Sequence, residues 1–127
     1  MPDQLPIILA VDDEPTPLYF RKLVLEKSGF QVVTASSAAE AISVLSQTEV
    51  DLVLSDVLMP QVTGTELARM IKKEWPHLPV VLVSGVNEIP PEAAYADAFI
   101  SKLEGPVLLC EKLHGILNGL HRAAVAE

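Results

Sequence analysis

The chain has 127 residues, of which half are hydrophobic and only 5% are aromatic, and its single cysteine, Cys110, excludes an internal disulfide. This length is enough to form a stable hydrophobic core without disulfide bonds. We therefore expect one domain over residues 1–127, with its folded part at about residues 6–120. The net charge of -8 argues against direct nucleic-acid binding, and no apolar stretch reaches the roughly 18 residues of a membrane span, so we expect a cytoplasmic protein.

The first third of the chain predicts two strands and two helices. Ile7–Val11 is an apolar run that ends in acidic residues and predicts a buried strand. Apolar residues then recur at the spacing of a helix that covers one face of a sheet, and Gly29 predicts its end. The apolar residues of this helix are Leu18, Phe20, Leu23, Val24 and Leu25. Residues 30–35 predict a weaker strand at a sheet edge, and Ser36 or Ser37 can cap the helix that follows.

The middle of the chain holds an almost unbroken apolar run, residues 51–59, which contains Asp56 and is stopped by Pro60. A run of this kind predicts a strand buried on both faces, as in parallel sheets covered by helices. A helical pattern follows and ends at Trp75 and Pro76, and residues 78–84 predict a fourth strand that ends at Ser84.

The last third contains Pro90 and Pro91, which leave room for one or two helical turns, then a short strand over residues 98–101 that ends at Lys102. Residues 106–118 predict a final helix with Gly119 as its cap. Five strands thus alternate with five helices. This alternation predicts an α/β fold with a doubly wound parallel sheet and helices on both faces.

Chemically active side chains follow four of the five predicted strands. Asp12 and Asp13 follow the first, Asp56 ends the third, Ser84 ends the fourth and Lys102 follows the fifth. If the first and third strands are neighbours, the three carboxylates converge at the switch point of the sheet. Their mutual repulsion calls for either raised pKa values or a cation, and a hard divalent ion such as Mg²⁺ fits the oxygen ligands. An aspartate beside Mg²⁺, a lysine and a hydroxyl can act as a nucleophile toward phosphorus.

These motifs together resemble the receiver domain of two-component response regulators. The residues that carry the resemblance are Asp12-Asp13, Asp56 within Asp-Val-Leu-Met-Pro, Gly64, Ser84-Gly85, Phe99 and Lys102. The resemblance covers essentially the whole chain. It implies a flavodoxin-like, five-stranded sheet with strand order 2-1-3-4-5.

The resemblance also implies a role for each site residue. Asp56 is the expected phosphoacceptor, and its donor is a histidine kinase or phosphotransfer protein. The expected Mg²⁺ ligands are the carboxylates of Asp13 and Asp56 and the backbone carbonyl of Leu58, with Asp12 acting mainly through water. Lys102 pairs with the acyl phosphate.

The expected switch residues are Ser84, which moves toward the phosphoryl group, and Phe99, an aromatic that swings inward but lacks a hydroxyl. The implied partners are the kinase and an unknown downstream protein, and we expect a monomer or a weak phosphorylation-dependent dimer. No direct contact with nucleic acid or membrane is expected.

Two features depart from the family pattern. Leu103 follows Lys102 where the family usually has a proline in a cis bond, and because a cis bond before another residue costs about 2.5 to 4 kcal/mol, we predict a trans bond. The segment between Ser84 and Phe99 is about one turn short, so we expect its helix to be short, displaced or partly unwound.

Three alternatives remain open. The chain can be a receiver module cut from a hybrid histidine kinase or a longer regulator. It can be a degenerate receiver that binds partners without phosphorylation, although the intact site argues against this. It can also be a Mg²⁺-dependent phosphohydrolase that forms an aspartyl phosphate, although such enzymes commonly have a second aspartate where this chain has Leu58. The favoured prediction is a phosphorylated signalling domain that is not an enzyme.

Overall fold

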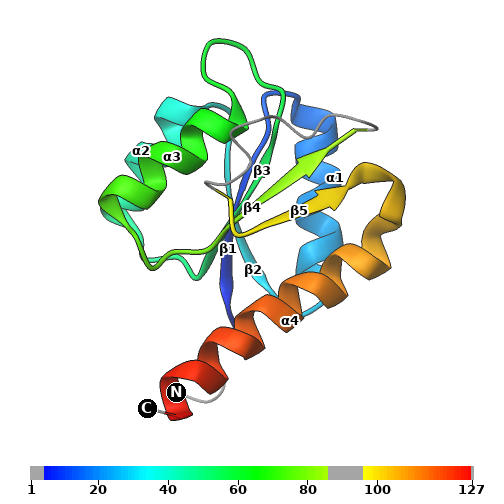
Figure 1. Cartoon of the computed structure of the whole chain (residues 1–127). Helices are drawn as coiled ribbons and strands as arrows, with labels where there is room; N and C mark the ends of the chain where they lie inside the picture. The colour runs from blue at the N-terminus through cyan, green and yellow to red at the C-terminus, as the bar shows by residue number, and fades with distance from the viewer. Residues whose placement is uncertain (1–4, 86–95, 127) are drawn as a thin grey trace.

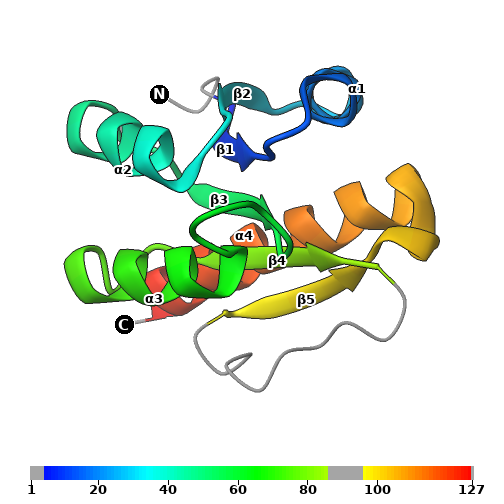
Figure 2. The same ribbon diagram turned by 90° about the horizontal axis from the view of Figure 1, so that it is seen from above.

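The computed structural model describes residues 5–85 and 96–126, and these form one parallel sheet in the order β2-β1-β3-β4-β5 (Figures 1 and 2). The strands are β1 (Ile7–Val11), β2 (Gln31–Ala35), β3 (Leu52–Asp56), β4 (Val80–Ser84) and β5 (Ala98–Ser101). Fold class and strand order confirm the prediction, including the position of β2 at an edge. The fourth strand begins at Val80, two residues later than predicted.

Helices cover both faces of the sheet. The helices of the described residues are α1 (Pro15–Lys27), α2 (Ala38–Gln47), α3 (Gly64–Glu74) and α4 (Gly105–Ala126), with a short 3-10 turn, η2 (Lys102–Glu104), between β5 and α4. Viewed from above, α2 and α3 lie on one face and α1 and α4 on the other (Figure 2). The additional helix predicted near Pro90 falls on residues 86–95, which lie outside the described residues. No described helix has the length and apolar character that a membrane crossing requires.

Alternate residues of the central strands build two aliphatic cores, one on each face. On the α2 and α3 side, Leu9, Val53 and Leu82 pack with helix residues such as Leu67. On the α1 and α4 side, Ile8, Leu54 and Val81 pack with residues such as Leu25 and Leu113. Cys110 is buried in this second core, where it packs as a small hydrophobic side chain. Burial on both faces explains why β3 and β4 begin with runs of consecutive apolar residues instead of alternating apolar and polar ones.

Local sequence signals set the ends of three helices. Gly29 ends α1 with a φ of 97°, a conformation that favours glycine, and the N–H of Phe30 donates to the Leu25 carbonyl. Ser37 caps α2, because its hydroxyl accepts a hydrogen bond from the Glu40 N–H at 3.1 Å. A reciprocal capping box between Thr63 and Glu66 begins α3.

Two predictions about the outer helices are wrong. Phe20 and Leu23 of α1 are exposed, at 66% and 44%, whereas Leu18 and Leu25 are buried against the sheet. The apolar residues of α1 surround the helix, so their spacing alone did not identify the buried face. The last helix does not end at Gly119 but continues to Ala126, and Gly119 is not among the described residues with positive φ.

The predicted geometry after Lys102 is confirmed. The described residues contain no cis peptide bond, so the bond between Lys102 and Leu103 is trans. The chain then turns through η2 directly into α4. Gly105, with a φ of 84°, allows this change of direction.

Candidate functional site

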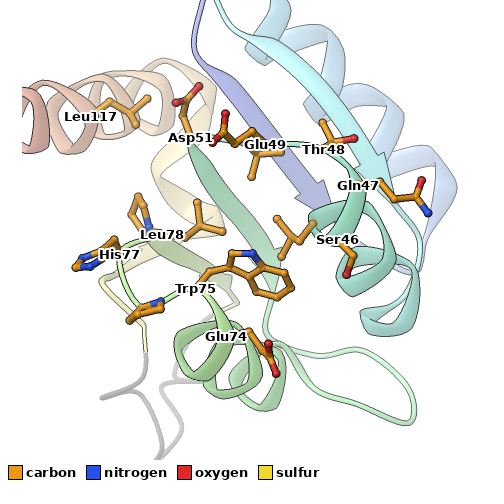
Figure 3. A pocket seen from close by; sticks show the side chains of 14 residues that line it. Ser46, Gln47, Thr48, Glu49, Asp51, Glu74, Trp75, His77, Leu78 and Leu117 are labelled. Carbon is orange, nitrogen blue, oxygen red and sulfur yellow. The ribbon is translucent and has the colours of Figure 1, made fainter.

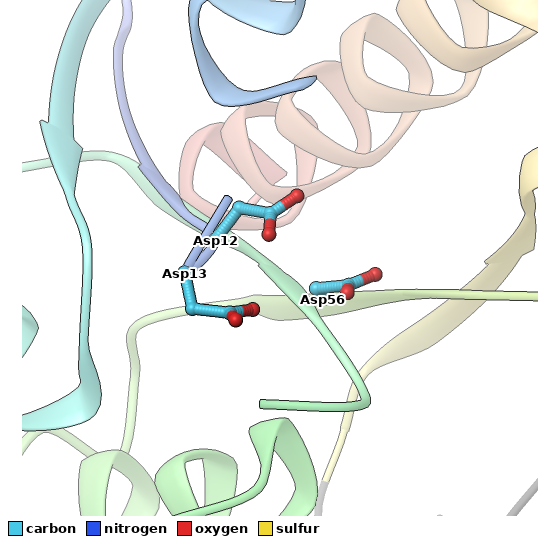
Figure 4. A group of neighbouring side chains, drawn as sticks. All are labelled: Asp12, Asp13 and Asp56. Atoms are coloured by element: carbon cyan, nitrogen blue, oxygen red, sulfur yellow. The ribbon is translucent and has the colours of Figure 1, made fainter. Parts of the chain in front are cut away.

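The structure brings the three predicted carboxylates together at the carboxyl end of the sheet. Asp12 and Asp13 directly follow β1, Asp56 is the last residue of β3, and Val11 pairs with Ser55 in the register between these strands. One carboxylate oxygen from each residue lies within 4.8 Å of the other two, and the side chains converge in Figure 4. Asp12 and Asp56 are almost fully buried, at 1% and 4% exposure. This acid cluster is the centre of the candidate site.

Asp12 carries the clearest electrostatic perturbation in the acid cluster. Burial raises the pKa of its carboxyl group, and the nearby charge of Asp56 adds to this rise. A hydrogen bond from the Glu14 N–H to Oδ1, at 3.0 Å, opposes the rise. The charges of Arg21 and Lys102 oppose it as well. Because the pKa of Asp12 is higher in the folded than in the unfolded chain, its ionised form costs stability at neutral pH. That cost disappears as the pH falls through the folded-state pKa.

Lys102 completes one side of the acid cluster. Its Nζ atom lies 2.9 Å from Oδ1 of Asp56, and the lysine is placed there by η2 directly after β5. The lysine side chain is partly exposed, whereas the Asp56 side chain is buried. The ion pair therefore sits at the edge of the site, where an incoming group can reach it.

Ser84 and Phe99 occupy strand positions beside the acid cluster. Asp56 pairs with Val83 in the register between β3 and β4, so the buried Ser84 lies one residue beyond Asp56 along the sheet. Phe99 lies on β5 and packs against the core under α2 and α3. Their roles in switching remain predictions.

The loop after β3 is tied closely to the acid cluster. The N–H of Gly64 donates to the Val57 carbonyl at 2.8 Å, and a Cβ at position 64 would overlap the backbone carbonyl oxygen of Asp56. Glycine at this position therefore allows α3 to begin against the end of β3. Leu58 lies in the same loop with a 58% exposed side chain, and the use of its carbonyl as a metal ligand remains a prediction.

Sequence reasoning missed one charged residue of the site, Arg21. Its Nη1 atom lies 3.8 Å from Oδ2 of Asp12, and its side chain is only 12% exposed. Helical spacing contains a signal for this placement, because Arg21 lies three residues after Leu18 and four before Leu25, both of which are buried. The residue was overlooked because a charged residue on a helix is usually exposed.

The donor set fits a hard divalent cation. Three carboxylates offer oxygen ligands, which Mg²⁺ prefers, and a partly hydrated ion can use the more open side at Asp13. The two nearby side-chain cations, Lys102 and Arg21, leave one negative charge of the acid cluster unbalanced. The acid cluster can therefore bind a divalent metal ion.

A separate hollow of about 860 Å³ lies at the opposite end of the strands (Figure 3). Asp51, just before β3, and Pro79, just before β4, contribute to its wall. Trp75 lines it but also packs against the core under α2 and α3. None of the predicted site residues lines this hollow, so its size does not make it the site of the predicted chemistry.

Comparisons with known proteins agree with the fold. A sequence model of the response regulator receiver domain matches residues 8–114. The transcriptional regulatory protein GlrR of Escherichia coli (strain K12) is 40% identical over 120 residues, which cover 94% of this chain but 27% of that relative. The chain therefore spans about a quarter of that relative's length.

Solved structures show the same architecture. A CheY-like receiver domain protein from Methanospirillum hungatei superposes with a TM-score of 0.86 at 30% identity, covering 94% of this chain and 99% of the other. TrrA from Thermotoga maritima, solved in complex with Mg(2+)-BeF, gives a TM-score of 0.83 at 28% identity, covering 87% and 98%. The chain belongs to the family of response regulator receiver domains of two-component systems.

Proposed function

We propose that this receiver domain accepts a phosphoryl group on Asp56 from the phosphohistidine of a histidine kinase or phosphotransfer protein, with Mg²⁺ bound at the acid cluster. The observation that carries the proposal is the buried Asp56 carboxylate, which belongs to the acid cluster and lies 2.9 Å from Lys102 Nζ. The similar response regulator TrrA was solved in complex with Mg(2+)-BeF, which supports Mg²⁺ as the ion for this chain.

In the transfer step, an oxygen of Asp56 bonds to phosphorus while the bond from phosphorus to the donor imidazole nitrogen breaks. The imidazole leaves with that electron pair. Lys102, which lies 2.9 Å from Asp56, would neutralise an oxygen of the transferred group, and burial of Asp56 would strengthen this interaction. The carboxylates of Asp13 and Asp56 and the Leu58 carbonyl would hold Mg²⁺, with Asp12 acting through water, and the bound ion supplies the remaining charge neutralisation.

The phosphorylated state would be communicated through Ser84 and Phe99. Ser84 ends the strand next to β3, so its hydroxyl can donate a hydrogen bond to a phosphoryl oxygen after a small movement. Phe99 on the neighbouring strand would then repack and change the surface offered to a downstream protein. Because Phe99 has no hydroxyl, that change would act through packing alone.

Labelling with a small phosphodonor tests the proposal. Acetyl phosphate and Mg²⁺ are expected to add one phosphoryl group per chain, as measured by intact mass, and chelation of the metal is expected to prevent the addition. Mg²⁺ binding without any labelling would instead support a degenerate receiver. Repeated turnover of a phosphomonoester, beyond one equivalent, would support the phosphohydrolase.

The leucine at position 58 disfavours the phosphohydrolase, because the second acid of such enzymes would stand at this position and leucine has no acidic group. Receiver domains occur in histidine kinases as well as in regulators. One example is the similar receiver domain of a histidine kinase from Syntrophus aciditrophicus. A module cut from a longer protein would use the same chemistry.

A further inference from the structure

Arg21 is an incompletely satisfied polar side chain beside the acid cluster. It projects from α1 toward the end of β1, and its Nη1 atom is buried with no hydrogen-bond partner among the described residues. A buried N–H group without a partner costs about 1 to 3 kcal/mol, and more when it is charged. A side chain held in this way needs a compensating interaction.

The carboxylate of Asp12 provides that interaction through charge. Its Oδ2 atom lies 3.8 Å from Arg21 Nη1, beyond hydrogen-bond distance, while its Oδ1 atom accepts the Glu14 N–H. Arg21 is among the groups that oppose the raised pKa of Asp12. At low local dielectric, two buried opposite charges at this distance attract strongly without a hydrogen bond.

The acid cluster is therefore flanked by two cations from different elements. Lys102 pairs with Asp56 from η2, and Arg21 faces Asp12 from α1. Both cations also line a hollow of about 350 Å³ between α1 and α4. A divalent ion bound to the acid cluster would approach a fixed positive charge on the Asp12 side.

We propose that Arg21 is a built-in counter-ion of the metal site, which neutralises part of the charge of Asp12 and thereby weakens Mg²⁺ binding. This inference rests on the proposed Mg²⁺ site. Arg21 competes electrostatically with the metal for the charge of Asp12, and the Glu14 N–H keeps the carboxylate in place when the arginine is removed. A purely structural role for Arg21 would predict the opposite, because its loss would then disorder the site and weaken binding.

Mg²⁺ titration by calorimetry at pH 8 tests the inference. Arg21→Met is expected to bind Mg²⁺ about fivefold more tightly than the wild-type chain, since one nearby positive charge is lost. Arg21→Lys keeps the charge and is expected to stay within about twofold of wild type. Lys22→Met is the matched control, because it removes a positive charge from the same helix at a partly exposed residue paired with Glu26. Unchanged or weaker binding by Arg21→Met, or equal tightening by Lys22→Met, would overturn the inference.

A metal-free experiment tests the contact itself. Asp12→Asn is introduced into the wild-type chain and into Arg21→Met, and urea midpoints are measured with chelator present. Removing the Asp12 charge is expected to stabilise the Arg21→Met chain more than the wild-type chain, because the variant lacks the nearby positive charge of Arg21. Equal effects in both backgrounds would show that the two residues do not interact. If the wild-type chain binds no Mg²⁺, both the proposed function and this inference are overturned. If the wild-type and Arg21→Met chains bind Mg²⁺ with the same affinity, the inference alone is overturned.

Discussion

Gly64→Ala is expected to lower the free energy of unfolding by about 3 kcal/mol. The added Cβ would overlap the carbonyl oxygen of Asp56 and lie 2.9 Å from its carbonyl carbon and 3.0 Å from the Cα of Val57. All three atoms belong to the backbone, which cannot turn aside as a flexible side chain can. Relief of the overlap requires α3 to move away from the end of β3, so the position of Asp56 should be disturbed as well.

Urea denaturation of Gly64→Ala and Gly115→Ala measures this effect against a matched control. Gly115 lies in α4, and a Cβ built there meets nothing within 4 Å. The same substitution at Gly115 is expected to stabilise the chain by about 0.5 to 1 kcal/mol, because alanine is the better helix former. Similar midpoints for the two variants would show that Gly64 does not fix the approach of α3 to Asp56.

Lys102→Met is expected to slow phosphoryl incorporation from acetyl phosphate by about 100-fold, the usual effect of removing one preorganised charge from a transferring group. Lys102 Nζ lies 2.9 Å from Asp56 Oδ1, and methionine keeps most of the length of the side chain without its charge. The lysine is partly exposed, so the fold should survive the substitution.

Lys112→Met is the control for this rate. Lys112 lies on α4 and pairs with Glu104, so its removal takes away the same charge without touching Asp56. Its labelling rate should stay within about twofold of wild type. If Lys102→Met also labels at the wild-type rate, Lys102 has no part in the transfer.

The sheet was predictable from sequence because its strands are buried on both faces. Runs such as Ile7–Val11 leave little alternative to a parallel sheet covered by helices, and Gly29 marks a helix end through its backbone conformation. The parallel arrangement also indicated the site, because the carboxyl ends of parallel strands lie at one edge of the sheet. The acid pair after β1 and Asp56 at the end of β3 therefore had to lie at the same edge.

Other features depend on tertiary contacts that local patterns do not contain. Phe20 is apolar yet exposed, and Arg21 is charged yet mostly buried, so residue type gave the wrong orientation for both. Gly119 resembles a helix cap but lies within α4, since a helix can continue through glycine at a modest cost. The pairing of Lys102 with Asp56 required the position of η2, which depends on the whole sheet.

Phosphorylation of Asp56 is tested most directly by intact mass of the wild-type chain and Asp56→Asn after incubation with acetyl phosphate and Mg²⁺. Asparagine has nearly the same shape but cannot form an acyl phosphate. Glu49→Gln, which removes an exposed carboxylate lining the hollow at the opposite end of the strands, serves as the control. The wild-type and Glu49→Gln chains are expected to gain one phosphoryl group and Asp56→Asn none. Equal labelling of Asp56→Asn would contradict the assignment of Asp56 as the phosphoacceptor.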